Sequence, residues 1–345
     1  MFSRLSSALI ITLLSLLCTT LHAQESDSTS CRPEFSLDYT TELLTDMKRA
    51  KWNHLLGLSC RLPLSERLAF DAGSISVLST SKDFFTDDLQ GLSNIEEANL
   101  PFALTVACLE WQIADGHTLY AGIRRMDEDY FCSDGLSFFT NSSCGAFPTV
   151  SLNHDIAVFP NAAMGIHYAY DSESLTLNLS LYNGQGSNRF AGRSNVFRLC
   201  PQSDGVFALG QMEYRHRGSS YFLGTSMHYG ESFSADGRRL SPVAWTYAEQ
   251  SLGSRLMLLA AVSHAFGSDA MCRNFAGLGA EYGLGCAKIG VFTDYVRVDG
   301  IDEYATEFSC SVPLCRSLSL QPTMHLVSTD GTTKCIAMMR MCLSL

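Results

Sequence analysis

The stretch SLTLNLSLYN, Ser174 to Asn183, decides the fold class, because apolar and polar residues alternate along its whole length. In an extended chain its four leucines face one way, and the threonine, asparagine, serine and tyrosine between them face the other way. This pattern predicts a strand that separates two unlike environments. In a soluble sandwich the leucine face would pack in the core, whereas in a membrane barrel it would contact lipid.

Similar runs occur along most of the chain. The alternation returns at Ser317–Leu326 and, with a tyrosine at each end, at Tyr221–Tyr229. Together the runs predict sixteen strands, an even number as in bacterial outer-membrane barrels. They lie near residues 35–45, 52–62, 68–78, 103–113, 118–126, 162–170, 174–183, 206–215, 220–229, 242–249, 255–265, 274–283, 286–297, 303–312, 316–327 and 334–345.

The connections between these runs are of two kinds. Tight turns are expected at 64–67, 114–116, 171–173 and 216–218, and long polar excursions at 79–102, 127–161 and 184–205. Short turns on one rim and long loops on the other are typical of an outer-membrane barrel. The predicted fold class is therefore all-β, a transmembrane antiparallel β-barrel of sixteen strands. The irregular, charged and aromatic stretch Ala121–Val150 is expected to fold into the lumen as a constriction loop.

The N-terminal residues predict export. Arg4 lies near the start, an apolar run follows from Ala8 to Leu17, and Leu21-His22-Ala23 precedes a polar segment. This arrangement predicts a signal peptide over 1–23, followed by a short polar segment over 24–33 and the barrel over 34–345. No later apolar stretch reaches the roughly 20 residues of a membrane-spanning helix. The net charge of -11 argues against a nucleic-acid partner.

The thirteen cysteines form no CxxC pair and no cluster with histidine at zinc spacing, so we expect no metal site. Several stand singly in apolar-alternating runs, where a cysteine serves as a small hydrophobic residue. We therefore expect mostly free cysteines, with a Cys132–Cys144 disulfide as the alternative.

Several stretches together resemble the carbohydrate-selective porins, the OprB-like family. They are LDYTTELLTDMKR, DDLQGLSNIEEAN, ALTVACLEWQ, SFFTNSSCGAFPTVS, YFLGTSMHYGESF and EYATEFSCSVPLCRSLSLQP, in this order. The resemblance implies a sixteen-stranded outer-membrane barrel that passes small sugars by facilitated diffusion, with no cofactor. This chain departs from the family at Ile123, at the final turn and in its cysteine content, which affects the expected solute more than the expected architecture.

A sugar pore needs a constriction that presents hydrogen-bonding groups and apolar surfaces, rather than a nucleophile. Strand alternation directs Arg124 into the lumen, and Glu110 is expected there as the partner of an inward arginine on the adjacent strand. The predicted constriction and substrate-binding residues are Arg124, Arg125, Glu110, Asp127, Asp129, Tyr130 and Phe131. Each has an alternative role: the charges could only pair with one another, and Tyr130, Phe131, Phe138 and Phe139 could anchor the loop to the wall.

Secondary lumen candidates are Arg189, Arg193 and His228. For the two arginines, a position in a solvated loop without a role in the lumen is an equally good interpretation. No serine, histidine and acid constellation stands out, so no catalytic residue is predicted. The expected partners are small sugars and outer-membrane lipid, and a homo-oligomer is possible. The alternative function is a structural or adhesion-type outer-membrane barrel whose lumen is closed by residues 127–161.

Overall fold

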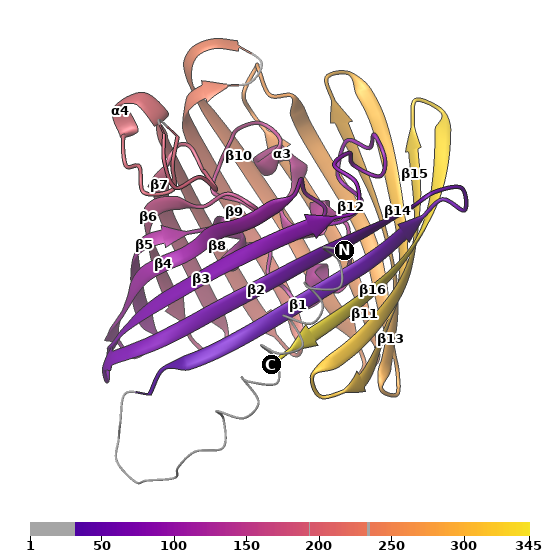
Figure 1. Ribbon diagram of the computed structural model, residues 1–345, viewed down its shortest axis with the longest axis horizontal. Coiled ribbons are helices and arrows are strands. Elements are labelled where there is room, and N and C mark those ends of the chain that lie inside the picture. Colours follow the sequence, from indigo (N-terminus) through magenta and orange to yellow (C-terminus); the bar gives the residue numbers. More distant parts are fainter. Residues whose placement is uncertain (1–31, 193, 233–234) are drawn as a thin grey trace, which may run out of the picture. The chain divides into compact units, whose positions relative to one another are not determined.

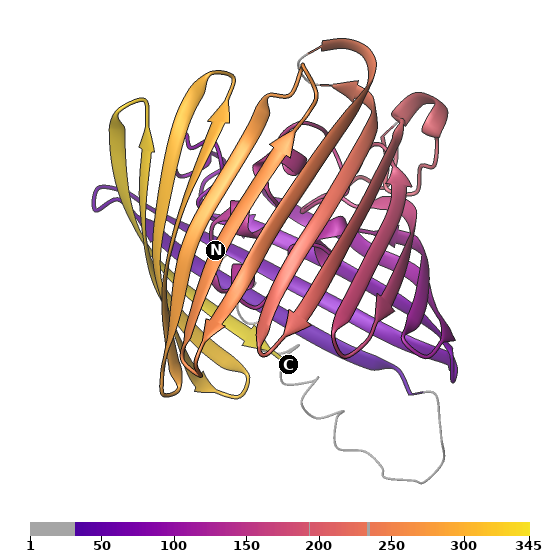
Figure 2. The ribbon, with the colours of Figure 1, turned by 180° about the vertical axis from the view of Figure 1, so that it is seen from behind.

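The computed structural model describes residues 32–192, 194–232 and 235–345, so the predicted signal peptide and most of the polar segment after it lie outside the described residues. In the described part, sixteen strands form one closed antiparallel barrel (Figures 1 and 2). The strands are β1 Glu34–Thr45, β2 Ala50–Ser65, β3 Leu68–Ser79, β4 Leu100–Ala114, β5 His117–Arg124, β6 Ala163–Asp171, β7 Leu175–Asn183, β8 Val206–His216, β9 Ser219–Ser232, β10 Ala235–Leu252, β11 Leu256–Ala265, β12 Cys272–Leu284, β13 Ala287–Val298, β14 Ile301–Cys315, β15 Leu318–Thr329 and β16 Thr332–Ser344.

The barrel is closed by the pairing of β1 with β16. Their register aligns Thr41 with Met341, and Leu37 exchanges two backbone hydrogen bonds with Leu345, of 3.0 and 2.9 Å. Closure leaves no strand edge without a partner, which is the condition for a sheet in a lipid environment. The predicted all-β barrel of sixteen strands is confirmed.

Each predicted run overlaps one observed strand, but several strands around the barrel are longer than predicted. The largest difference is β10, which begins at Ala235 rather than near residue 242. Together with β9 it forms a hairpin that rises above the neighbouring strands in Figure 1. The sequence there, ADGRRLS, has Leu240 as its one large apolar residue and so shows no apolar–polar alternation. Hydropathy alternation therefore carries no strand signal where both faces of a strand meet water.

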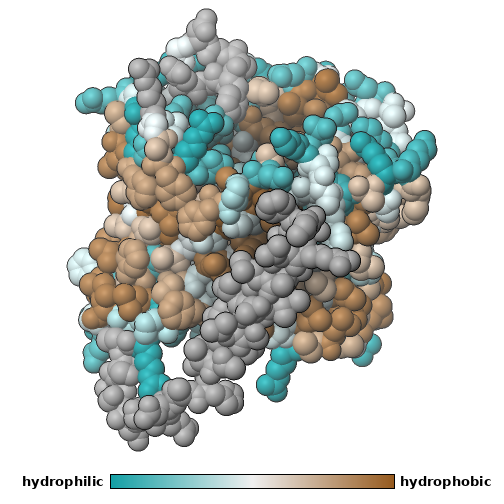
Figure 3. Space-filling model, in the orientation of Figure 1, coloured by the Kyte–Doolittle hydropathy of each residue, from teal (hydrophilic) through white to brown (hydrophobic). Residues whose placement is uncertain are grey.

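The two faces of β7 behave as the opening stretch predicts. Leu179 and Leu181 are 46% and 45% exposed on the outside, whereas Ser180 and Tyr182 are buried on the inside. Exposed large apolar side chains occur on the outer face of most strands, and Figure 3 shows apolar residues covering much of the middle of the visible face. An apolar outside and a polar or packed inside is the arrangement of a membrane barrel.

The two rims differ as predicted. One rim carries only tight connections in the described chain, such as those between β2 and β3 and between β4 and β5. The other rim carries three long connections, residues 80–99, 125–162 and 184–205. They contain the short helices η1 Met126–Glu128, η2 Leu136–Phe138, α2 Ser142–Gly145, α3 Pro148–Ser151 and α4 Pro201–Asp204. Among the described residues, no helix has the length and apolar character needed to cross a membrane.

We call residues 125–162 the inserted segment and residues 80–99 the second segment. The inserted segment lies within the ring of strands in both ribbon views (Figures 1 and 2). Its buried side chains pack against the inward side chains of β7 to β13, in a cluster that includes Trp245, Phe275 and Phe292. A smaller apolar cluster of Leu44, Phe85, Leu92, Ile336 and Met338 packs the second segment against β1 and β16.

Candidate functional site: the lumen between the inserted segments

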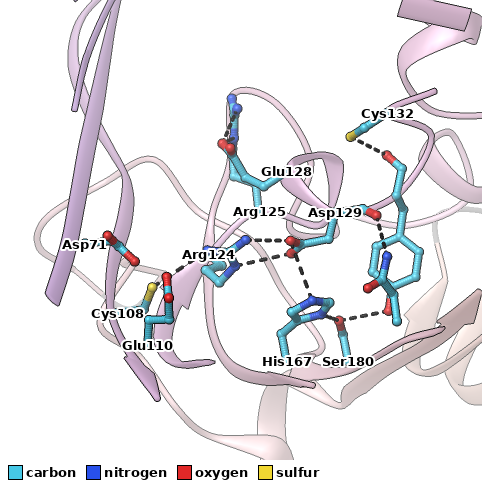
Figure 4. Close-up of polar contacts among 12 residues, drawn as sticks. Asp71, Cys108, Glu110, Arg124, Arg125, Glu128, Asp129, Cys132, His167 and Ser180 are labelled. Atoms are coloured by element: carbon cyan, nitrogen blue, oxygen red, sulfur yellow. Dashed lines mark hydrogen bonds and ion pairs between the residues drawn. The ribbon is translucent and has the colours of Figure 1, made fainter. Parts of the chain in front are cut away.

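The inserted segment begins at an ion pair. Arg124 is the last residue of β5, and its guanidinium donates to the carboxylate of Asp129 at 2.6 and 3.2 Å (Figure 4). The guanidinium also lies 4.4 Å from the ring centre of Tyr120, and Nε2 of His167 lies 3.6 Å from Oδ1 of Asp129. Burial raises the pKa of the Asp129 carboxyl, against the lowering effect of the Arg124 cation. Arg124 points into the lumen, as alternation requires, but it is engaged by the loop.

Arg125 makes a second local ion pair. Its Nη2 lies 2.6 Å from Oε1 of Glu128, and its Nε lies 3.6 Å from Oδ1 of Asp127. Burial raises the pKa of the Asp127 carboxyl, while the Arg125 cation lowers it. These contacts join residues three or fewer positions apart. They hold the first turn of the segment in place. Of the roles that the sequence left open for these charges, the contacts favour pairing with one another.

Glu110 has an inward arginine as its partner, but the arginine is not the one on the adjacent strand β5. Arg61 of β2 donates to both carboxylate oxygens of Glu110, at 2.5 and 2.6 Å. On β3, the strand between β2 and β4, Oδ1 of Asp71 lies 3.2 Å from Nη1 of Arg61. The sequence prediction missed Arg61. A signal was present, because Arg61 is the only Lys, Arg, Asp or Glu in the run 52–62 and lies on the same face as Asn53 and Ser59.

The aromatic residues of the inserted segment anchor it to the wall. Tyr130 is fully buried, and its hydroxyl donates to Ser180 at 2.9 Å, so it faces β7 rather than the passage. Phe131 and Phe147 have ring centres 4.7 Å apart and belong to the same cluster as Trp245 and Phe275. Of the two roles that the sequence left open for Tyr130, its lack of exposed surface favours the anchoring role.

A glycine in the wall makes room for this packing. Gly290 of β13 lies under Phe138 and Phe139, and a Cβ atom there would come within 2.6 Å of Cε1 of Phe138. The two phenylalanines meet edge to face, with ring centres 5.0 Å apart. This contact supports the anchoring role for Phe138 and Phe139 as well.

Carboxylates of the barrel wall hold both segments by their backbone amides. Glu307 of β14 accepts from the amides of Thr140 and Asn141, at 2.9 to 3.0 Å. Glu249 of β10 accepts from the amides of Gly135 and Leu136 at 3.0 and 3.2 Å. In the second segment, the amides of Leu89 and Gln90 donate to Glu303 at 2.9 and 3.2 Å. A buried carboxylate needs hydrogen-bond donors, and the buried backbone amides of a loop without regular structure need acceptors, so each group satisfies the other.

The second segment also folds into the lumen, which the sequence did not predict beyond a long excursion. Lys51 of β2 pairs with Glu96 at 2.6 Å, and Arg340 of β16 pairs with Glu42 of β1 at 2.9 Å. Arg340 also donates to the side chain of Asn94 at 2.8 Å. The two segments touch each other, because Gln90 accepts a hydrogen bond from Ser143 at 2.7 Å.

A cavity of about 720 Å³ remains between the two segments and the wall of β1, β2, β3 and β16. Its volume is in the range of small-ligand sites, on the order of 300–1,000 Å³. Of the predicted constriction residues, Arg125, Asp127 and Phe131 line this cavity, whereas Arg124, Glu110, Asp129 and Tyr130 do not. The cavity is lined by both aromatic rings and polar groups, and the rings include Phe84, Phe131 and Phe159.

The secondary candidates have other positions. Arg189 is exposed on the connection 184–205 and does not line the cavity, and its neighbour Phe190 stacks on Phe102 of β4. Arg193 lies outside the described residues. His228 faces the lumen but is buried, stacked on His154 with ring centres 3.9 Å apart, and in contact with the carbonyl of Gly184 at 2.8 Å.

Two further kinds of chemistry, metal binding and disulfide formation, can be checked in the described chain. Within the described chain, no group of three or more His, Cys, Asp or Glu side chains is arranged to hold a metal ion. The eleven cysteines in this part of the chain are all free, so the Cys132–Cys144 disulfide is not formed. The paired arginines, amides and ring faces of the lumen are suited to contacting a passing solute.

The comparisons with solved structures agree with this architecture. OprB of Pseudomonas putida, in a high-pH structure, is 15% identical with a TM-score of 0.76, over 91% of this chain and 94% of that chain. The fold is that of a porin. An anion-selective porin from Comamonas acidovorans is 10% identical with a TM-score of 0.61, over 91% and 99% of the two chains.

A mutant porin of Rh. blastica is 9% identical with a TM-score of 0.61, over 91% of this chain and 100% of that chain. No protein-family model matches the sequence, and no curated protein matches it.

Proposed function

We propose that this protein is an outer-membrane porin that lets small solutes, with a preference for sugars, diffuse passively along their gradient. The observation that carries the proposal is the 720 Å³ cavity inside a closed barrel, bounded by two in-folded segments. A pore of this type needs a narrow region with polar groups for hydroxyls and rings for the C–H faces of a sugar. The predicted signal peptide and the resemblance to the sugar porins support export to the outer membrane.

Planar-bilayer recording of the purified full-length protein tests the proposal. We expect a steady conductance that added glucose reduces, and faster swelling of liposomes in glucose than in a disaccharide. Folded protein without conductance would contradict it. Recovery of the protein in the outer-membrane fraction tests the proposed location.

A structural barrel with a closed lumen is the second candidate, and the depth of packing favours it. Phe131, Phe147 and Phe139 are at most 2% exposed, so the inserted segment is held as firmly as a protein core. This candidate predicts no swelling in any sugar, and no gain when residues 127–161 are replaced by a short linker. A permeable wild-type protein would exclude it.

A further inference from the structure

Most basic side chains that face the lumen in the described part of the chain are paired with carboxylates. Seven described Lys and Arg residues on the inward face of the strands or in the inserted segment each have a carboxylate oxygen within 3.2 Å: Lys51 with Glu96, Arg61 with Glu110, Arg124 with Asp129, Arg125 with Glu128, Arg215 with Glu213, Lys288 with Glu281, and Arg340 with Glu42. Arg61 and Arg125 each have a second carboxylate within 4 Å, in Asp71 and Asp127. Positive charge is therefore balanced or exceeded at each of these positions.

The cavity has carboxylates beyond those needed for this pairing. Asp88 and Glu97 of the second segment line it, and neither has a basic partner within ion-pair distance in the described part of the chain. Asp88 accepts a hydrogen bond from the hydroxyl of Thr86, and Glu97 accepts one from the amide of Ala98. Such neutral donors orient a carboxylate and leave its charge in place.

The walls around the cavity make the electrostatic potential of these carboxylates stronger than it would be on an open surface. Field lines concentrate in a passage with low-dielectric walls, so a small excess of one sign changes the local concentration of ions and charged solutes. An anion entering the cavity would meet two uncompensated carboxylates, and both cavity arginines, Arg125 and Arg340, are already engaged. A neutral sugar does not experience this barrier.

We propose that the passage admits neutral and cationic saccharides and disfavours anionic ones, with Asp88 and Glu97 as the residues that set this preference. The proposal rests on the proposed pore function and names its solute class. Amino sugars are the cationic solutes that fit, and uronic or aldonic acids are the ones disfavoured. Small inorganic ions should follow the same order.

Reversal potentials in a potassium chloride gradient test the preference directly. The full-length protein should be more permeable to potassium than to chloride. Asp88→Asn and Glu97→Gln should each lower this ratio by about two- to five-fold, as for the loss of one charge acting at close range in water-like surroundings. The matched control is Asp87→Asn, because Asp87 is exposed next to Asp88 and does not line the cavity. The control should keep the wild-type ratio.

Liposome swelling with solutes of similar size separates the two proposals. We expect glucosamine to enter at least as fast as glucose, and glucuronate several-fold more slowly, with the double variant Asp88→Asn/Glu97→Gln narrowing the difference. Equal rates for glucose and glucuronate, or a chloride preference, would overturn the inference while the pore function stands. The absence of both conductance and glucose entry would overturn the pore function and this inference with it.

Discussion

Nη2 of Arg124 lies 2.6 Å from Oδ1 of Asp129, and this contact ties the last residue of β5 to the first turn of the inserted segment. Both side chains are 12% exposed. Removing one partner of such a pair leaves the other charge poorly compensated, whereas removing both does not. The pair therefore fixes where the segment enters the lumen, and Arg124 is available to a solute only through its remaining surface.

A double-mutant cycle on Arg124→Ala and Asp129→Asn should give a coupling energy of about 0.5–3 kcal/mol, because the two groups share one contact. Urea titration of the protein in lipid vesicles measures it. Arg49 and Asp46 are the control pair, since their side chains are 61% and 29% exposed and such pairs contribute about 0–1 kcal/mol. Equal coupling for both pairs would show that Arg124 does not anchor the segment.

Conductance should change in the same variants. We expect Arg124→Ala to increase single-channel conductance and to weaken block by sugar, because the entry turn of the segment loses its tie to β5. Planar-bilayer recording checks this. If conductance and block both stay at wild-type values, Arg124 has only a local structural role.

Glu307→Ala should loosen the inserted segment from the wall. The two amides of Thr140 and Asn141 would lose their acceptor, at a cost of about 1–3 kcal/mol per buried unsatisfied group. Increased current noise and faster proteolysis within residues 125–162 would report the change. Glu34→Ala is the control, because Glu34 is exposed at the start of β1. The same noise in both variants would contradict the anchoring role.

Phe147→Ala should lower the free energy of unfolding by about 3–5 kcal/mol, as expected for a buried phenylalanine. Phe147 has no exposed surface and contacts Phe131 and Phe275, both at 4.7 Å between ring centres. Phe266→Ala is the comparison, because Phe266 is 62% exposed. A similar loss in both variants would show that the segment adds little to stability.

Asp129 should make stability depend on pH in the acid range. Burial raises its pKa in the folded protein above the usual 3.8, so the folded state binds the proton at a higher pH than the unfolded state does. The slope of unfolding free energy with pH is then negative in this window. Relative to Asp129→Asn, the wild type should gain stability as the pH falls toward 3.8 and lose it as the pH rises through the raised pKa. Urea titrations at several pH values measure the difference, and parallel curves would contradict it.

The barrel could be predicted from the sequence because its signal is local. Alternating residues such as those of Ser174–Asn183 report which face of a strand meets lipid, and turn residues report where the strand ends. The same rule gave the inward direction of Arg124. It failed to extend β10 to Ala235, since a strand with water on both faces needs no alternation.

The partners of the lumen residues were decided by the tertiary structure alone. Arg340 and Glu42 are 298 positions apart, and Thr140 and Glu307 are 167 apart, so no local pattern could pair them. Arg61 took Glu110 because strand tilt and register, which depend on closure of the whole sheet, bring β2 and β4 together across β3. The sequence by itself determined that the chain forms a barrel with an irregular segment available to fill it. Only the closed structure decided which charges that segment neutralises and which it leaves facing the cavity.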